Sequence, residues 1–168
     1  MCGDLGTLIG RSIWFILPAY VANAAPVVVG GGRPLDGGRK MSDGRPVFGP
    51  GKTVRGLVGG LMAGFLVGVI QFLITLSAAY LVQALLMSAG ALSGDLLGSF
   101  MKRRMGVPRG GAAPLLDQLG FLAFALLFVA PLAFPGWDSV VVLVVITPPL
   151  HLATNFLGYR AGLKSRPY

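Results

Sequence analysis

Residues 57–94 read LVGGLMAGFLVGVIQFLITLSAAYLVQALLMSAGALSG and contain no Asp, Glu, Lys, Arg or His. A transmembrane helix needs about 20 consecutive apolar residues, so this run is long enough to cross a bilayer twice. We expect two spans joined by a tight turn near residues 75–79. The run therefore predicts an integral membrane protein rather than a soluble domain.

The rest of the chain has the same character. Of its 168 residues, 54% are hydrophobic and 12% are charged, and the mean hydropathy is +0.75. Soluble domains carry about 25% charged residues. The sequence predicts an all-α bundle of about five transmembrane helices, with residues 1–168 forming one membrane domain. The expected spans are 7–29, 57–75, 79–99, 116–134 and 139–159.

Positive charge gathers in two loops, about 30–56 and 100–115, and in the tail, while the other two connections have none. Cytoplasmic loops carry an excess of Lys and Arg, so we expect an outside N-terminus and a cytoplasmic C-terminus in the cell membrane. Basic residues beside spans also meet anionic lipid, so the net charge of +8 does not require a nucleic-acid partner. The Lys and Arg residues of the two loops and the tail are Arg33, Arg39, Lys40, Arg45, Lys52, Arg55, Lys102, Arg103, Arg104, Arg109, Arg160, Lys164 and Arg166.

Glycine and proline mark two of the spans. Glycines at positions 56, 60, 64 and 68 share one face of the second span, where small residues let helices approach closely. We expect a packing face, used either within one chain or in a homodimer. In the fifth span, Pro148-Pro149 is expected to break or kink the helix, because neither residue has a backbone N–H to donate.

Two aspartates are the strongest candidates for chemistry, because the chain has no glutamate and only six aspartates. Asp95 and Asp117 fall at the expected cytoplasmic ends of adjacent spans, and ionisable groups at membrane depth are usually functional. Two carboxylates brought together across a short loop can bind a hard divalent cation such as Mg²⁺. The alternative is that each only pairs with Lys102 or Arg103 nearby in sequence.

The first basic loop is too long and too rich in Gly and Pro to be a simple connector. Its end, Gly51-Lys52-Thr53-Val-Arg55, leads into the second span, whose helix N-terminus favours phosphate. The string is not a Walker A motif, because Pro46 stands where the first glycine should be. Contact with lipid head groups is the alternative for the loop and tail cations, among them Lys164.

Other polar residues are expected to serve structure. One cysteine and one histidine are too few for a zinc site, and Cys2 is expected to be incidental. His151 is expected to form a helix–helix hydrogen bond rather than to act in catalysis. The same is expected of Asn23, Gln71, Gln83 and Asn155.

The two cytoplasmic loops and their flanking spans resemble the membrane CTP-dependent cytidylyltransferases that make CDP-lipids. Their archaeal branch, the CDP-archaeol synthases, is the more similar, because Pro108-Arg109 and Gly120 depart from the bacterial pattern. The first part of the resemblance is Ser93-Gly-Asp95, Ser99-x-x-Lys102-Arg103 and Pro114-x-x-Asp117. The second part is Pro34-Leu-Asp36-x-Gly-Arg39, Asp43-Gly-Arg45 and Gly51-Lys52-Thr53-x-Arg55-Gly56.

The resemblance implies an enzyme that joins CTP to an isoprenoid ether lipid phosphate, unsaturated archaetidic acid, with Mg²⁺ as cofactor and pyrophosphate as by-product. It implies that Asp95 and Asp117 hold the metal, with Lys102 as a third catalytic residue. Asp43 either joins the metal site or orients a lysine, as does Asp36. The residues implied to bind the nucleotide are Asp43, Lys52, Thr53, Arg55, Ser99 and Arg103.

Two other functions are compatible with a small basic membrane protein. A CDP-alcohol phosphotransferase is also embedded in the membrane and metal-dependent, but its Asp-Gly…Ala-Arg…Asp…Asp spacing is not found here. An anion channel or transporter could use basic rings and broken helices. Against it, the charges gather on one side of the predicted bundle.

Overall fold

The computed structural model of the protein describes residues 4–108, 111 and 113–164, so Cys2, Arg109 and Arg166 lie outside the described residues. Within these ranges it is all-helical, with two isolated β-bridges in the first loop. The five helices are α1 (Leu5–Val29), α2 (Val54–Thr75), α3 (Ala79–Arg104), α4 (Pro114–Val129) and α5 (Trp137–Arg160). The predicted all-α class and the number of helices are confirmed.

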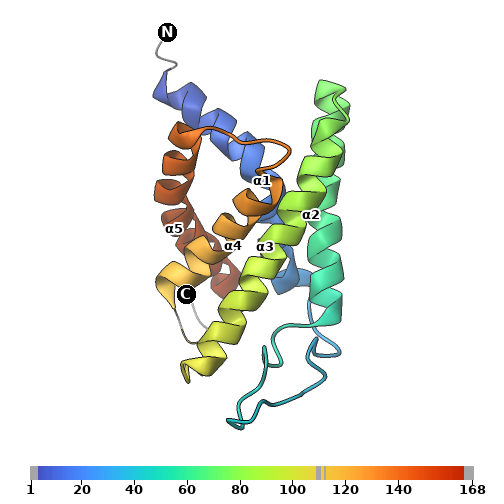
Figure 1. The fold of residues 1–168 in the computed structure, drawn as a ribbon, viewed down its shortest axis with the longest axis vertical. Coiled ribbons are helices and arrows are strands. Elements are labelled where there is room, and N and C mark those ends of the chain that lie inside the picture. The colour runs from blue at the N-terminus through green and yellow to red at the C-terminus, as the bar shows by residue number, and fades with distance from the viewer. Residues whose placement is uncertain (1–3, 109–110, 112, 165–168) are drawn as a thin grey trace.

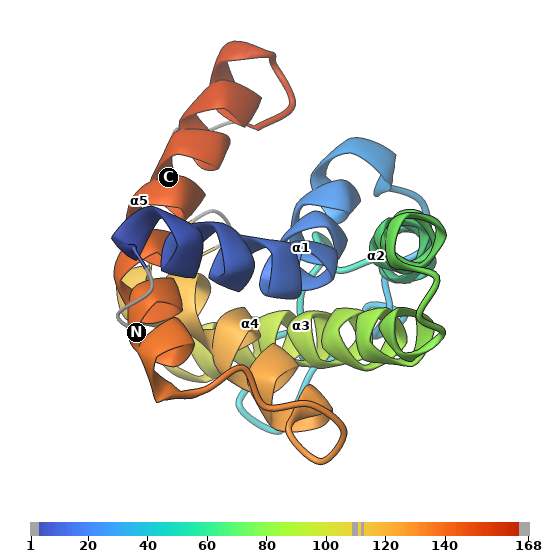
Figure 2. The same ribbon diagram turned by 90° about the horizontal axis from the view of Figure 1, so that it is seen from above.

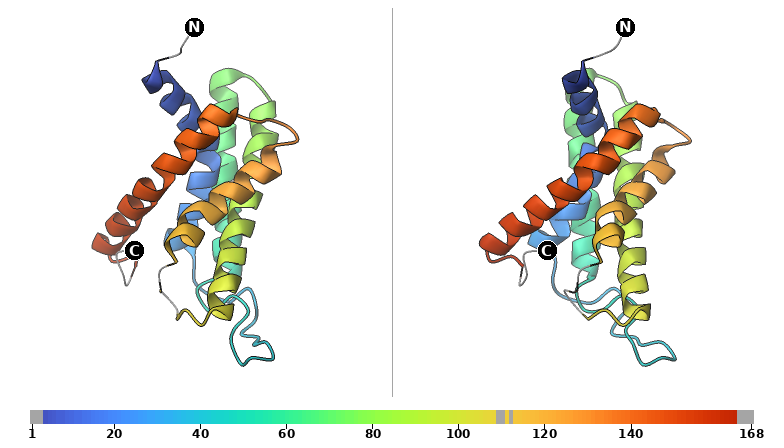
Figure 3. Two further views of the ribbon diagram at one scale, coloured as in Figure 1. Left: turned by 60° about the vertical axis from the view of Figure 1, so that its left-hand side comes forward. Right: turned by 90° about the vertical axis from the view of Figure 1, so that its left-hand side faces the viewer.

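The helices are arranged around α3. α2 packs on one side of α3 and α4 on the other, while α1 contacts all four other helices (Figures 1 and 2). Among the described helices, α5 packs only on α1 and α4. It leans away from the rest of the bundle toward its C-terminal end (Figure 3).

Four of the helices are long and apolar enough to cross a membrane, and α4 is the exception. α4 has 16 residues, which at about 1.5 Å per residue is shorter than the roughly 30 Å hydrocarbon core. The prediction that this span reaches residue 134 is wrong. Pro131 follows shortly after Val129 and cannot continue the helical hydrogen bonding.

Of the break or kink predicted at Pro148-Pro149, the break is wrong, because α5 continues through both residues from Trp137 to Arg160, and the kink stays a prediction. Prolines are tolerated within membrane helices when the surroundings compensate for the lost hydrogen bonds. α1 likewise contains Pro18 and Pro26.

Both long loops lie at one end of the bundle, opposite the α2–α3 turn and the α4–α5 connection (Figure 1). This arrangement agrees with the pattern of charged loops. That the basic end faces the cytoplasm stays a prediction.

The glycine face of α2 packs within the chain. A Cβ atom at Gly60 would lie 2.8 Å from the carbonyl oxygen of Ala22 and 2.9 Å from Leu92 Cδ2. One at Gly64 would lie 2.7 Å from the carbonyl oxygen of Pro18. These distances are too short for a side chain, so the glycines set the spacing of α2 against α1 and α3. The α2 glycine face is therefore covered by α1 and α3 of the same chain, as in the first of the two alternatives.

A second glycine face on α3 went unnoticed in the sequence, although it has the same spacing. A Cβ at Gly90 would lie 2.9 Å from the Cα of Ala125, and one at Gly94 would lie 2.6 Å from the carbonyl oxygen of Gly120. α3 is thus in close backbone contact with α4, just as α2 is with α1. The residue after Gly94 is Asp95, so this contact also fixes the position of that carboxylate.

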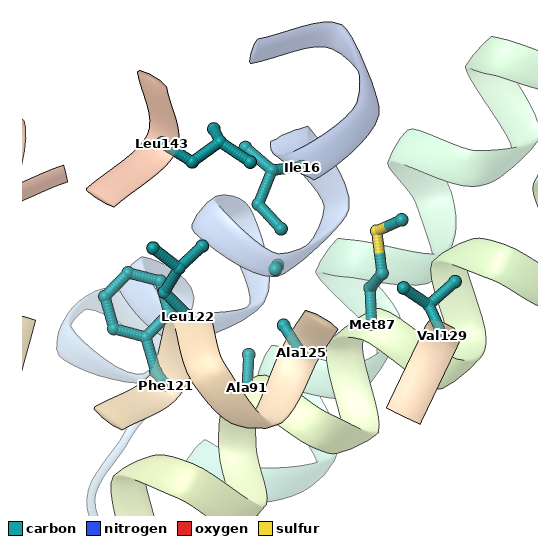
Figure 4. Packing of buried hydrophobic residues seen from close by; sticks show 9 residues of the cluster. Ile16, Met87, Ala91, Phe121, Leu122, Ala125, Val129 and Leu143 are labelled. Atoms are coloured by element: carbon teal, nitrogen blue, oxygen red, sulfur yellow. The ribbon is translucent and has the colours of Figure 1, made fainter. Parts of the chain in front are cut away.

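The buried apolar cluster lies where α1, α3, α4 and α5 meet (Figure 4). Ile16 lies beside Leu143 of α5, Met87 lies beside Val129 of α4, and Ala91 and Ala125 lie between Met87 and Leu122 (Figure 4). Some polar side chains in the interior are hydrogen-bonded across helices, as between Tyr20 of α1 and Thr147 of α5, whose hydroxyl oxygens lie 2.7 Å apart. Gln71 donates through Nε2 to the carbonyl oxygen of Trp14 at 2.6 Å, which confirms its predicted helix–helix role.

Replacing Gly64 by leucine should destabilise the protein, because the new side chain would push α2 away from α1 and α3. Overpacking usually costs about 1–3 kcal/mol, and we expect at least the upper value where backbone is the obstacle. Thermal unfolding of the detergent-solubilised protein measures the effect. Val58→Leu, on the exposed face of the same helix, is the control and should change the midpoint little. Equal midpoints for the two variants would contradict the packing role.

Candidate functional site

An open cavity of about 1390 Å³ lies between α1, α3, α4, α5 and the end of the first loop. Its wall contains polar side chains from the loop, α3 and α4, and apolar side chains from α1 and α5. Most of the residues singled out in the sequence line this cavity. They are Lys52, Thr53, Asp95, Ser99, Lys102, Arg103 and Asp117.

Each of the two aspartates forms an ion pair with a lysine. Lys52 Nζ lies 2.5 Å from Asp95 Oδ2, and Lys102 Nζ lies 2.5 Å from Asp117 Oδ1. The Lys102–Asp117 pair is the local pairing considered from the sequence. Asp95 instead pairs with a residue of the first loop. All four side chains are between 15% and 31% exposed, so each charge is partly removed from water and needs its partner.

Asp117 is held at the start of α4. Its Oδ2 accepts a hydrogen bond of 3.0 Å from the backbone N–H of Ala113, at the helix N-terminus, where a negative charge is favoured. Asp95 lies within α3, next to the close contact of Gly94 with α4. Both carboxylates are thus positioned by backbone geometry and face the same cavity.

Asp36 anchors the segment that carries Lys52. Its carboxylate accepts hydrogen bonds from the N–H groups of Gly38, Phe48 and Gly49 at 2.9–3.0 Å. Slight burial tends to raise the pKa of Asp36, but these three donors stabilise the charged form and hold the pKa below its usual value. The loop therefore folds on this carboxylate.

Asp43 docks the first loop onto the end of α3. Arg104 donates to Asp43 Oδ2 at 2.6 Å and to the carbonyl oxygen of Pro46 at 2.6 Å. The N–H of Arg45 and then the charge of Arg104 hold the pKa of Asp43 below its usual value. Asp43 lies outside the described cavity lining, as does Arg55, which is exposed at the start of α2. A nucleotide-binding role for these two residues stays a prediction.

The N-terminus of α2 satisfies part of its own hydrogen-bonding need. Thr53 Oγ1 accepts from the N–H of Gly56 at 3.1 Å, and the N–H of Val54 donates to the carbonyl oxygen of Arg33. Thr53 therefore caps the helix. Fewer backbone donors are available for phosphate here than the sequence alone suggests.

α5 brings polar residues to the cavity that the sequence analysis had assigned to structure. Asn155 Nδ2 lies 3.3 Å from Nδ1 of His151, and Lys164 Nζ donates to Asn155 Oδ1 at 2.5 Å. The predicted helix–helix hydrogen bond of His151 is wrong, because its partner is one turn away on the same helix. The sequence did contain a signal for this contact, because His151 and Asn155 are polar residues four positions apart within one span and so lie on the same helix face.

The cavity wall suits a polyanion. It carries four cationic residues, Lys52, Lys102, Arg103 and Lys164, against two carboxylates. Burial lowers the pKa of Lys164, and the positive charge of Lys52 lowers it further, so the two ammonium groups share one electrostatic environment. Val27, Leu150 and Leu157 contribute apolar surface to the same cavity.

Asp95 and Asp117 are the two carboxylates of the cavity that could bind a divalent cation. In the described part of the chain no three His, Cys, Asp or Glu side chains come together, so a closed all-protein site is not formed. Mg²⁺ is commonly bound by one or two carboxylates together with water and substrate phosphates. Asp95 and Asp117, which line one cavity with several cations, fit that mode.

Comparison with known proteins places these features in a family. The family model described as CarS-like CDP-archaeol synthase matches residues 5–168. The CDP-archaeol synthase of Thermococcus onnurineus is 52% identical over 163 residues, covering 94% of this chain and 95% of that protein. That of Pyrococcus furiosus is 48% identical, covering 94% and 97%.

A solved structure of an intramembrane enzyme for archaeal membrane lipids biosynthesis has the same fold. It is 43% identical, with a TM-score of 0.82, covering 88% of this chain and 94% of that one. Together with the apolar helices, this similarity identifies a multi-pass membrane protein. The resemblance seen in the two loops is confirmed, and the chain belongs to the CarS-like family of CDP-archaeol synthases.

Proposed function

We propose that this protein transfers the cytidylyl group of CTP to an isoprenoid ether lipid phosphate. The acceptor is 2,3-bis-O-geranylgeranyl-sn-glycerol 1-phosphate, and the products are the CDP-lipid and pyrophosphate. The observation that carries the proposal is the mixed lining of the cavity, in which two carboxylates and four cations face apolar residues of α1 and α5. Family membership supports this reaction over the phosphotransferase and channel alternatives.

The reaction is an in-line displacement at the α-phosphorus of CTP. An oxygen of the lipid phosphate forms a new bond to that phosphorus, and the bond to the α–β bridging oxygen breaks. Pyrophosphate leaves with the electron pair. The attacking phosphate is already ionised near neutral pH, so no side chain must remove a proton. Such transfers depend mainly on positioning and on charge stabilisation.

The lining residues divide into two groups of roles. Lys52, Lys102 and Arg103 would hold phosphate oxygens of the triphosphate and the departing pyrophosphate, and Ser99 adds a hydroxyl. Asp95 and Asp117 would hold Mg²⁺. When bound, that ion neutralises phosphate charge and orients the triphosphate. Lys52 and Lys102, which pair with these carboxylates in the structure, would then be available to bind substrate phosphate.

The cavity also accounts for how a water-soluble and a membrane-bound substrate could meet. CTP would approach from the end that carries the basic loops, which we place in the cytoplasm on the basis of charge. The hydrocarbon chains would stay in lipid beside α1 and α5, whose side chains line the apolar part of the cavity.

Purified protein should incorporate label from radiolabelled CTP into lipid when Mg²⁺ and the ether lipid phosphate are present. Phosphatidic acid serves as the competing acceptor, and a chelator replaces the metal in parallel reactions. Metal-dependent labelling of the ether lipid supports the reaction. Folded protein that labels neither lipid would contradict it.

Asp95→Asn and Asp117→Asn should each lower turnover by at least about 100-fold, the scale of losing one electrostatic group at a reaction centre. Asp138→Asn is the matched control. Asp138 is exposed in the first turn of α5, whereas the cavity is lined by the later part of that helix, from Thr147 onward. If the two aspartates hold the metal, the residual activity of each variant should also require a higher Mg²⁺ concentration than the wild-type activity does. If residual activity keeps the wild-type Mg²⁺ dependence, the aspartates serve only as partners of the lysines.

A further inference from the structure

Lys164 lies beyond the end of α5 and turns back to the cavity. Its side-chain stem lies against the last turn of the helix, since a Cβ built on Gly158 would be 3.7 Å from Lys164 Cδ. Its ammonium group donates to Asn155 Oδ1 and joins the cavity wall with Lys52 and Lys102. The chain thus places a third lysine at the site from a different element.

The charge of Lys164 is compensated differently from that of the other two lysines. Lys52 and Lys102 each have a carboxylate partner, whereas Lys164 takes part in none of the three ion pairs among the described residues. Its ammonium group instead donates to a neutral amide, that of Asn155. Among the described residues no carboxylate lies within ion-pair distance of this half-buried ammonium, and only the more distant Asp95 and Asp117 offset its charge. An anion bound in the cavity would therefore be favoured beside it.

The amide that holds Lys164 is itself held in place. Asn155 is only 7% exposed, and its amide nitrogen lies within hydrogen-bond distance of His151 Nδ1. Because the oxygen accepts from the lysine, the NH₂ group is left to donate to an unprotonated Nδ1. The His151 ring in turn lies 6.3 Å from the ring of Phe121, centroid to centroid. Lys164 is therefore positioned by a connected set of side chains.

We propose that Lys164 binds the phosphate group of the lipid substrate, and that Asn155 and His151 are positioning residues for it. The inference rests on the proposed function and deepens it. The lipid phosphate is favoured over the triphosphate because Leu157 and Leu163, close to Lys164 in the chain, line the same cavity. A phosphate bound there would have its hydrocarbon chains beside the apolar wall. The carboxylates and their lysines belong to α3, α4 and the first loop.

Steady-state kinetics with both substrates varied test the assignment. Lys164→Gln should raise KM for the lipid phosphate by at least about tenfold and leave KM for CTP within about twofold, as expected for losing a charged hydrogen bond to one substrate. Lys164→Arg should restore much of the lipid KM, because it keeps the charge. Lys40→Gln is the matched control, since Lys40 is an exposed residue of the first loop outside the described lining.

The role of Asn155 is tested by a double-mutant cycle. Asn155→Leu alone should raise KM for the lipid phosphate, but it should add little in the Lys164→Gln background, because residues that act through one contact are not additive. A purely structural role would give the same loss in both backgrounds and would contradict positioning.

Direct binding separates failure of this inference from failure of the proposed function. Binding of a short-chain glycerol ether phosphate is measured for wild-type protein and Lys164→Gln without CTP. Weaker binding by the variant, together with a wild-type protein that forms no CDP-lipid, would overturn the proposed reaction but keep the phosphate site. Equal binding overturns the inference, and so does a rise in KM for CTP alone, which would assign Lys164 to the nucleotide.

Discussion

The compensation of partly buried charge is the constraint on which this structure depends. A lysine or an aspartate removed from water needs an opposite charge, and the chain supplies one by pairing Lys52 with Asp95 and Lys102 with Asp117. The first pair joins the end of the first loop to the central helix α3, and the second joins α3 to the start of α4. The same two contacts that allow these charges to be buried therefore bring three segments to one cavity.

Close backbone packing makes this arrangement possible. Gly60 and Gly64 bring α2 against α1 and α3, while Gly90 and Gly94 bring α3 against α4. With these helices in direct contact, little room is left between them, and α5 packs only on α1 and α4 among the described helices. The cavity lies on the side where α5 leans away (Figure 3). Small residues in one part of the bundle thus leave space for a substrate in another.

The first loop is an ordered part of the site despite its composition. Asp36 gathers three backbone N–H groups, and Asp43 with Arg104 attaches the loop to α3. Both aspartates were candidates for direct chemistry in the sequence, and in the structure Asp36 binds backbone N–H groups while Asp43 binds Arg104. Through these contacts the two aspartates fix the segment from which Lys52 reaches Asp95.

The sequence by itself determined the membrane character, the number of helices and most of the polar cavity wall. These properties follow from hydropathy and from the scarcity of charge, both of which can be read locally. Only the tertiary structure decided which lysine meets Asp95, that the glycine face of α2 packs within the chain, and that His151, Asn155 and Lys164 face the cavity. Lys52 and Asp95 are 43 residues apart, and their approach is set by helix packing that no local pattern encodes. The direction a polar side chain faces depends on which helix lies opposite, so its role could be decided only once the bundle was assembled.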